Sequence, residues 1–341
     1  MPSLNLAWVI AGLIVVGLTT YVILAGADFG GGVWDFLARG PRKAEQRQAI
    51  AKAMGPVWEA NHVWLIFVLV LMFTAFPPAF AAMSTALAIP LSLAAVGIVL
   101  RGANFVFRAH AASVAGAARI FGVMFGAASL ITPFMLGLCV GALGSGNIRV
   151  ENSKIVSSYY TPWLAPFPIL TGLLAVALCS FLAAVYLTLE TSGELQEDFR
   201  RRAVISGIAT AVIATIALPF TIEGAPVLWQ QLIWGRATAL VIGTVVLGLV
   251  AMMMSYLRHY SIARIATIAE VACIVGGWAL AQAPYMIVPD ITVTGAAAPD
   301  SALGPQLIAL AIGLVFLLPS LGFLLYVFKG QNPAAEISGE E

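Results

Sequence analysis

An acid and a histidine stand three positions apart in the segment GPVWEANHVWLI, residues 55–66. At helical spacing, Glu59 and His62 lie on one face of a helix, and lipid is an unfavourable environment for both side chains. A carboxyl group that is shielded from water can hold or pass a proton, and histidine titrates near physiological pH. A structural reading is that the helix dipole stabilises an acid in the first turn. That reading accounts for Glu59 but not for His62, so the pair is a candidate for proton transfer.

Two further charged residues lie at the ends of neighbouring apolar runs. Asp28 lies in LAGADFGGGVWDF, and Arg101 ends a later run. Small residues four apart let another helix approach closely, and the triple glycine is expected to weaken the helix just after the carboxylate. Because consecutive spans alternate in direction, we expect both residues to reach the membrane level of the Glu59–His62 pair. There they serve either as a proton entry path from the cytoplasm or as ion pairs that fix the helix order.

Other reactive side chains give weaker signals. Glu270 is the acid deepest within an apolar run, and an unpaired carboxylate is costly there, so it is expected to face the protein interior or a partner subunit. The three histidines all map to the ends of apolar runs or to loops: His62, His110 and His259. The three cysteines form no CxxC or CxxCH motif. We therefore expect no metal site, no haem held by this chain alone and no catalytic residue in it.

The composition places these residues in an integral membrane protein. Of 341 residues, 61% are hydrophobic and 10% are charged, and the mean hydropathy is +0.97. This leaves too few polar side chains to cover a water-soluble globule. The net charge of +1, without a basic patch interleaved with aromatics, argues against nucleic acid as a partner. Short loops and the lack of a GxxxxGK[ST] motif exclude ATP-driven transport by this chain alone.

Apolar runs near the length of about 20 residues that a bilayer requires predict nine helices in one transmembrane domain, residues 1–341. The predicted helices are 5–27, 57–76, 79–100, 118–143, 163–189, 203–222, 236–257, 262–283 and 305–328. Because the runs are continuous rather than alternating, a β-barrel is disfavoured. The expected architecture is all-α, with two four-helix bundles and one peripheral helix.

The basic residues predict the orientation of these helices. All of the 17 Lys and Arg except Arg149, Lys154 and Arg236 fall on one side of the predicted spans. Because basic residues accumulate in cytoplasmic loops, the N-terminus is expected outside and the C-terminus inside. The first apolar run has no basic n-region and no cleavage pattern, so we expect it to remain as a span rather than be removed as a signal peptide.

The chain resembles subunit II of cytochrome bd-type quinol oxidases in segments that occur in order along nearly its whole length: GADFGGG, GPVWEANHVWLI, FPPAF, LRGANFVFR, YLTLETSGEL and APYMIVPD. The resemblance implies a haem-free half of a heterodimer in the bacterial cytoplasmic (inner) membrane, surrounded by membrane lipids. Its partner, subunit I, would carry two b-type haems and a d-type haem. The complex would oxidise quinol and reduce dioxygen to water with protons from the cytoplasm.

The resemblance also implies roles for individual residues. In that family the position of Glu59 is commonly aspartate and lies in a proton channel shared with subunit I, and Asp28 and Arg101 match polar positions of the same region. Two positions depart from the family pattern: Ala25 replaces the first acid of DGFDxG, and Gly102 stands where proline is frequent. Some members hold a structural quinone in subunit II. The sequence leaves open a quinone position and small accessory subunits.

Two other functions remain open from the sequence. In a proton-coupled secondary transporter, the polar residues Asp28, Glu59, His62 and Glu270 would be substrate or coupling sites, but such folds usually have broken helices near the midplane. In a structural scaffold, the charges would serve helix packing alone. Purification separates these readings, since a partner of similar size with haem absorption supports the oxidase. A colourless homo-oligomer favours transport or scaffolding.

Overall fold

The computed structural model describes residues 5–110 and 117–330, and their side chains except those of 55–60, 105–106, 108–110, 117–119 and 324–330. The elements in chain order are α1 (Leu6–Phe36), α2 (Lys43–Ala75), α3 (Pro77–Ala86), α4 (Ala88–His110), α5 (Ala117–Ser145), β1 (Val150–Glu151), β2 (Lys154–Ile155), α6 (Pro166–Leu189), α7 (Gly193–Gly224), α8 (Pro226–Ile233), α9 (Thr238–Tyr256), α10 (Tyr260–Gln282), β3 (Tyr285–Ile287), β4 (Ile291–Thr292), α11 (Val293–Ala296) and α12 (Asp300–Gly330). The fold is helical, with two small antiparallel hairpins, β1–β2 and β3–β4.

Seven of the described helices are long and apolar enough to cross a membrane: α1, α5, α6, α7, α9, α10 and α12. The bent pair formed by Asn61–Ala75 and Pro77–Ala86 would add an eighth, and the apolar part of α4, Ala88–Asn104, is shorter. The predicted class, a helical multi-pass membrane protein, is confirmed. The number nine remains a prediction.

The structure divides the predicted helix 79–100 into α3 and α4 and bends the chain before it. The axes of Asn61–Ala75 and Pro77–Ala86 differ by 116°. Pro77 begins a new helix because its fixed φ suits a first turn, while proline has no N–H with which to continue α2. The second break lies at Leu87, because Pro90 has no N–H to donate to the carbonyl of Ala86.

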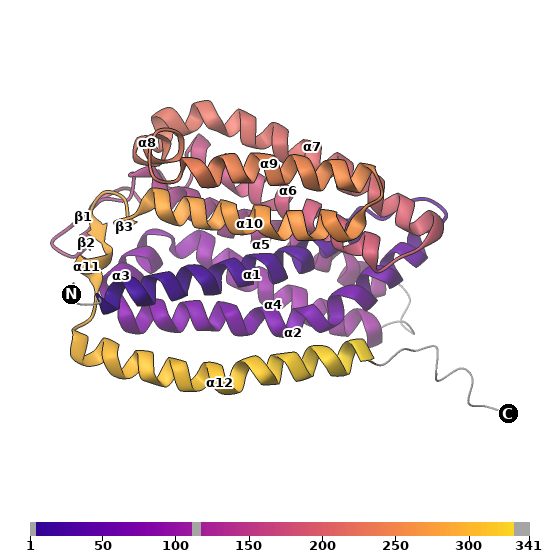
Figure 1. The fold of residues 1–341 in the computed structure, drawn as a ribbon, viewed down its shortest axis with the longest axis horizontal. Helices are drawn as coiled ribbons and strands as arrows, with labels where there is room; N and C mark the ends of the chain where they lie inside the picture. Colours follow the sequence, from indigo (N-terminus) through magenta and orange to yellow (C-terminus); the bar gives the residue numbers. More distant parts are fainter. Residues whose placement is uncertain (1–4, 111–116, 331–341) are drawn as a thin grey trace.

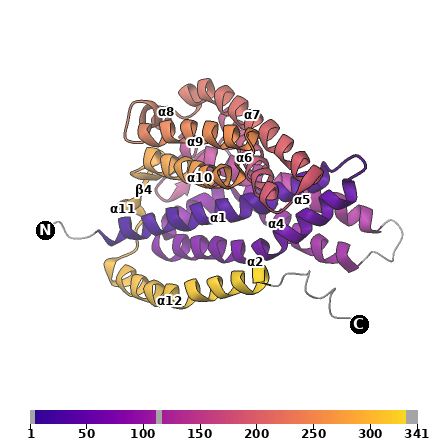
Figure 2. The same ribbon diagram turned by 45° about the vertical axis from the view of Figure 1, so that its right-hand side comes forward.

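Helix α1 lies at the centre and packs against α2, α5, α6 and α10, as Figures 1 and 2 show. The expected weakening by the triple glycine does not occur, because α1 is continuous through it. Each glycine instead faces a different neighbour: Gly30 the backbone of Cys179 on α6, Gly31 helix α2, and Gly32 the hydroxyl of Ser129 on α5. The run therefore brings three helices close to α1 just beyond Asp28.

Helix α12 lies at the edge of the molecule. In Figure 1 it runs along α2 on the side away from α10, and its helix contacts are with α1 and α2. None of the residues in its apolar window is buried within the chain. Its apolar side chains therefore face lipid or another chain.

Candidate functional site

Asp28 of α1 and Arg101 of α4 form a buried ion pair. Their exposed fractions are 1% and 4%. Arg101 Nη1 donates to Asp28 Oδ2, and Nη2 donates to Oδ1 at 2.5 Å and to the backbone carbonyl of Asp28 at 2.8 Å. A guanidinium that engages both carboxylate oxygens is held in one orientation. The pair therefore fixes α4 against α1 at this depth.

Helix α5 completes the surroundings of Arg101. The Nε of Arg101 donates to the hydroxyl of Ser129 at 3.0 Å. Its guanidinium carbon lies 5.3 Å from the ring centroid of Phe29 and 4.9 Å from that of Phe125. A buried charge is costly unless it is paired and hydrogen-bonded, and aromatic faces also attract cations. Every nitrogen of the guanidinium therefore has a partner.

Helix α2 contributes Asn61 to the same cluster. Asn61 is 1% exposed, and its Nδ2 donates to Asp28 Oδ2 at 3.1 Å. The other amide atom, Oδ1, is buried and has no hydrogen-bond partner in the described part of the chain. A buried polar atom without a partner is a position where a water molecule or a proton donor is stabilised. The sequence analysis did not identify this residue, although it lies between the two residues that were singled out on α2.

The structure brings together some of the predicted residues. Asp28 and Arg101 are in contact, and His62 is half-buried on α2 beside Asn61. Glu59 also lies on α2, but its side chain is outside the described set, as are those of His110, Arg108 and Arg119. We therefore define the polar cluster as Asp28, Asn61, Arg101 and Ser129.

Glu270 lies on a different helix pair from the polar cluster. It is 6% exposed on α10, and a Cβ atom on Gly248 of α9 would lie 2.6 Å from its Oε1. Its Oε2 is buried without a partner in the described side chains. The expectation that Glu270 faces the interior is consistent with this position.

A second buried acid on α1, Asp35, was missed by the sequence analysis. Asp35 is 2% exposed, its Oδ2 lies 3.7 Å from Arg47 Nε on α2, and its backbone carbonyl accepts a hydrogen bond from the same nitrogen at 3.2 Å. Asp35 could have been predicted from the sequence, because it follows Asp28 by seven residues and this spacing places both acids on one face of a helix.

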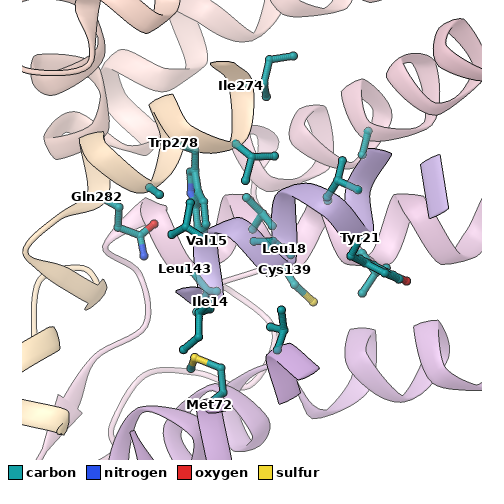
Figure 3. Close-up of a pocket in the computed structure, with 18 of the residues that line it drawn as sticks. Ile14, Val15, Leu18, Tyr21, Met72, Cys139, Leu143, Ile274, Trp278 and Gln282 are labelled. Atoms are coloured by element: carbon teal, nitrogen blue, oxygen red, sulfur yellow. The ribbon is translucent and has the colours of Figure 1, made fainter. Parts of the chain in front are cut away.

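A large apolar cavity of about 780 Å³ lies among α1, α2, α5, α6 and α10. Figure 3 shows Trp278 and Gln282 of α10 towards one end of it and Tyr21 of α1 towards the other. Gln282 Nε2 donates to the carbonyl of Met286 at 2.8 Å. The Oε1 of Gln282 and the Nε1 of Trp278 are buried and have no partner among the described groups. At this end the cavity thus has a donor and an acceptor that no described group satisfies.

In the part of the chain that the structure describes, no three His, Cys, Asp or Glu side chains come together as a metal site. His259 is exposed at the N-cap of α10, and His62 is half-buried on α2.

A family model for cytochrome bd terminal oxidase subunit II matches residues 6–328. Cytochrome bd ubiquinol oxidase subunit 2 of Bacillus subtilis strain 168 is 30% identical over 223 residues, covering 64% of this chain and 63% of that protein. Cytochrome bd-I ubiquinol oxidase subunit 2 of Escherichia coli K12 is 26% identical over 216 residues, covering 62% and 55%. The matched regions span less than two thirds of these relatives.

The fold is shared with a solved structure. A chain of the bd oxidase from Geobacillus thermodenitrificans superposes with a TM-score of 0.80, covering 96% of this chain and 100% of that one at 21% identity. Identity this low supports a statement about fold alone. The family model, in contrast, extends over nearly the whole chain. The chain therefore belongs to the family of cytochrome bd terminal oxidase subunit II.

Proposed function

We propose that this chain is the haem-free subunit II of a quinol:dioxygen oxidoreductase in the bacterial cytoplasmic membrane. It would support a haem-bearing subunit I and supply it with protons from the cytoplasm. Family membership and the names of the relatives, ubiquinol oxidase subunits, support the oxidase assignment. The observation that carries the proton path is the polar cluster, because a buried charge pair beside an unpartnered acceptor is costly in a membrane span without a function.

The geometry supports different roles for the members of this path. Both carboxylate oxygens of Asp28 already accept hydrogen bonds, so an arriving proton would have to displace Arg101 or Asn61. Asp28 therefore acts by holding Arg101 in place. The mobile proton is assigned to Glu59 and His62, because carboxyl and imidazole groups are the usual general acids and bases of proteins. The free lone pairs of Asn61 Oδ1 would bind a water molecule that connects them.

Proton supply matters because electrons that enter a buried haem must be balanced by positive charge. Dioxygen reduction to water also consumes protons as a reactant. A subunit without redox groups can thus limit the rate of the whole complex. The haems and the reaction with dioxygen are assigned to subunit I.

We also propose nine spans with the N-terminus outside and the C-terminus inside, arranged as two four-helix bundles with α12 peripheral. Ion pairs support the sidedness, since they join segments predicted to lie on one side. Arg42, the N-cap of α2, binds Asp198 of α7 at 2.8 Å, and Arg258, after α9, lies 3.4 Å from Glu197 of α7. On the side predicted to lie outside, Arg149 forms an ion pair with Asp290. This pair also joins two segments that are predicted to lie on the same side.

A structural quinone is assigned to the cavity of about 780 Å³. Its apolar wall suits an isoprenoid tail, and the Nε1 of Trp278, which has no partner among the described residues, can donate to a quinone carbonyl. Gln282 Oε1 is a hydrogen-bond acceptor, and a quinone has no O–H group to donate to it. The reduced form, a quinol, has hydroxyl groups that can donate to Gln282 Oε1. Solvent extraction of the purified complex, followed by chromatography, would identify the bound species. Release of no quinone from this complex would contradict the assignment.

The proton path is tested by the substitution Glu59→Gln in the complete complex. Turnover with quinol and dioxygen should fall by about tenfold or more, because a positioned acid or base contributes roughly 10²–10⁴-fold to a proton transfer. The haem content, read from the absorption spectrum, should stay unchanged because the haems lie in the partner.

The matched control is Glu45→Gln, which makes the same chemical change at an exposed position of the same helix. Its turnover should equal that of the wild type. Full activity of Glu59→Gln with normal haem content would contradict the proton path, while the family assignment would stand.

A further inference from the structure

Asp35 and Arg47 lie at the end of the α1–α2 hairpin that is nearest its connecting loop. Asp35 is the second-last residue of α1, and Arg47 lies in the second turn of α2. The side chain of Asp35 is 3% exposed, and that of Arg47 is 29% exposed. The arginine is therefore the more exposed member of the pair, and it lies next to the buried carboxylate.

A line of polar groups leads from Asp35 into the membrane span. Asp28 lies two helical turns, or about 10 Å, further along the same face of α1. Between the two acids, at Gly32, a Cβ atom would lie 2.0 Å from the hydroxyl oxygen of Ser129. This hydroxyl touches α1 only because Gly32 has no side chain, and it also accepts from Arg101. Its own proton is donated to the backbone carbonyl of Phe125 at 2.8 Å. Ser129 is therefore the member of the polar cluster that contacts α1 between Asp28 and Asp35.

The line ends at an acceptor that has no partner within the described residues. Asn61 Oδ1 is buried next to Asp28, on the helix that also carries Arg47 and Glu59. An ion pair that only fastened α1 to α2 would require neither a hydroxyl beside Gly32 nor an open acceptor at the far end. This combination points to a hydrated path.

We propose that Asp35 is the entrance acid of the proton path and that Arg47 is the side chain that covers it. The inference rests on the proposed function and extends it outwards from the polar cluster. The Asp35 carboxylate takes a proton from water and gives it up towards Ser129 and Asn61 through intervening water molecules. It returns to the carboxylate form, so the residue is unchanged after each transfer. Another charged group at this end of α1 is Arg202 of α7, whose guanidinium carbon lies 5.2 Å from the ring centroid of Trp34.

The test uses the complete complex with Asp35→Asn, Asp35→Glu and the control Glu45→Gln. The fully reduced complex is mixed with dioxygen, and proton uptake from the medium is followed with a soluble pH dye. Asp35→Asn should slow this uptake by about tenfold at alkaline pH and less at acidic pH, because an acid that collects protons matters most when free protons are scarce. Asp35→Glu should stay within about twofold of the wild type, because it restores an acid. The exposed Glu45→Gln should have no effect.

The remaining outcomes distinguish the entrance role of Asp35 from the proton path through Glu59. If Asp35→Asn takes up protons at the wild-type rate while Glu59→Gln is slow, the entrance role of Asp35 is overturned and the proton path stands. If both variants are fast, the proton path itself fails. Should Asp35→Asn not assemble, Asp35→Ser replaces it as a smaller neutral variant. Failure of both neutral variants to assemble would make Asp35 a folding residue and overturn the inference.

Discussion

At the scale of single residues, Arg101 is the best-satisfied charge in the described part of the span region. Its three nitrogens donate to Asp28 or Ser129, and two aromatic rings, Phe29 and Phe125, cover its faces. A charge so enclosed is stable only while its partner is present. The cost of removing one member of the pair should therefore exceed the cost of removing both.

Arg101→Met should lower the free energy of unfolding by about 3–5 kcal/mol, because it leaves Asp28 charged and unpaired in a buried position. The double variant Asp28→Asn, Arg101→Met should be less destabilised than Arg101→Met alone, because it leaves no buried charge. Denaturant titration of the purified complex measures both. A double variant that is at least as unstable as the single one would contradict this account.

Sequence reasoning identified the charged members of this cluster because charges are rare in apolar runs. Asp28 and Arg101 were predicted to reach the same level, and they are in contact. Asn61 and Ser129 were missed because uncharged polar residues are common in membrane helices and have no distinctive spacing. Asp35 was missed although its spacing from Asp28 was available, since it lies where α1 was expected to have already ended.

At the scale of helices, the glycines of α1 determine how closely its neighbours approach. A Cβ atom at Gly30 would lie 1.9 Å from the backbone oxygen of Cys179, which cannot move away as a flexible side chain could. At Gly12 no atom of another described segment lies within 4 Å of such a Cβ atom. The same substitution should therefore have opposite effects at the two positions.

Gly30→Ala should destabilise the subunit by at least about 1–3 kcal/mol, because the added methyl group forces α1 and α6 apart. Gly12→Ala should be neutral or stabilising by up to about 1 kcal/mol, because alanine favours a helix more than glycine does. Thermal unfolding of the assembled complex compares the two. Equal stability of both variants would contradict the close approach of α1 and α6.

The course of the helices was predictable where the pattern is long and apolar, as in α6 and α10. The bend at Phe76 lies where the predicted helix 57–76 ends. The break at Leu87, within the predicted helix 79–100, was not predicted, because hydropathy continues across it while Pro90 acts through its missing N–H group. The short helix α8 and the two hairpins were missed for another reason. They are too short to give a periodic signal.

At the scale of the whole molecule, an ion pair joins two distant connections at one end of the helices. Arg149, between α5 and α6, donates from Nε to Asp290 Oδ2 at 2.8 Å, and the backbone N–H of Val150 donates to the same oxygen at 2.8 Å. Partial burial of Asp290 opposes its charged form, but these hydrogen bonds outweigh that effect and lower the pKa of the carboxyl below its usual value. The charged carboxylate thus stabilises the folded chain.

A lowered pKa in the folded state gives stability that is present above the unfolded pKa, at about 4, and is lost as the pH falls through the folded value. Asp290→Asn should therefore reduce stability at neutral pH by less than about 1 kcal/mol, because Arg149 is largely exposed. In strongly acidic buffer the two proteins should converge. A constant difference in unfolding temperature across this pH range would contradict the role of the carboxylate.

The buried pair of Asp28 and Arg101 has one further consequence for a membrane protein. The opposite charges of Asp28 and Arg101 cancel at contact distance, so a transmembrane voltage exerts almost no net force on them. Their arrangement should be the same in a polarised and in a depolarised cell. If the chain acts in the oxidase proposed above, any voltage dependence of turnover would then come from the electrons and protons that move.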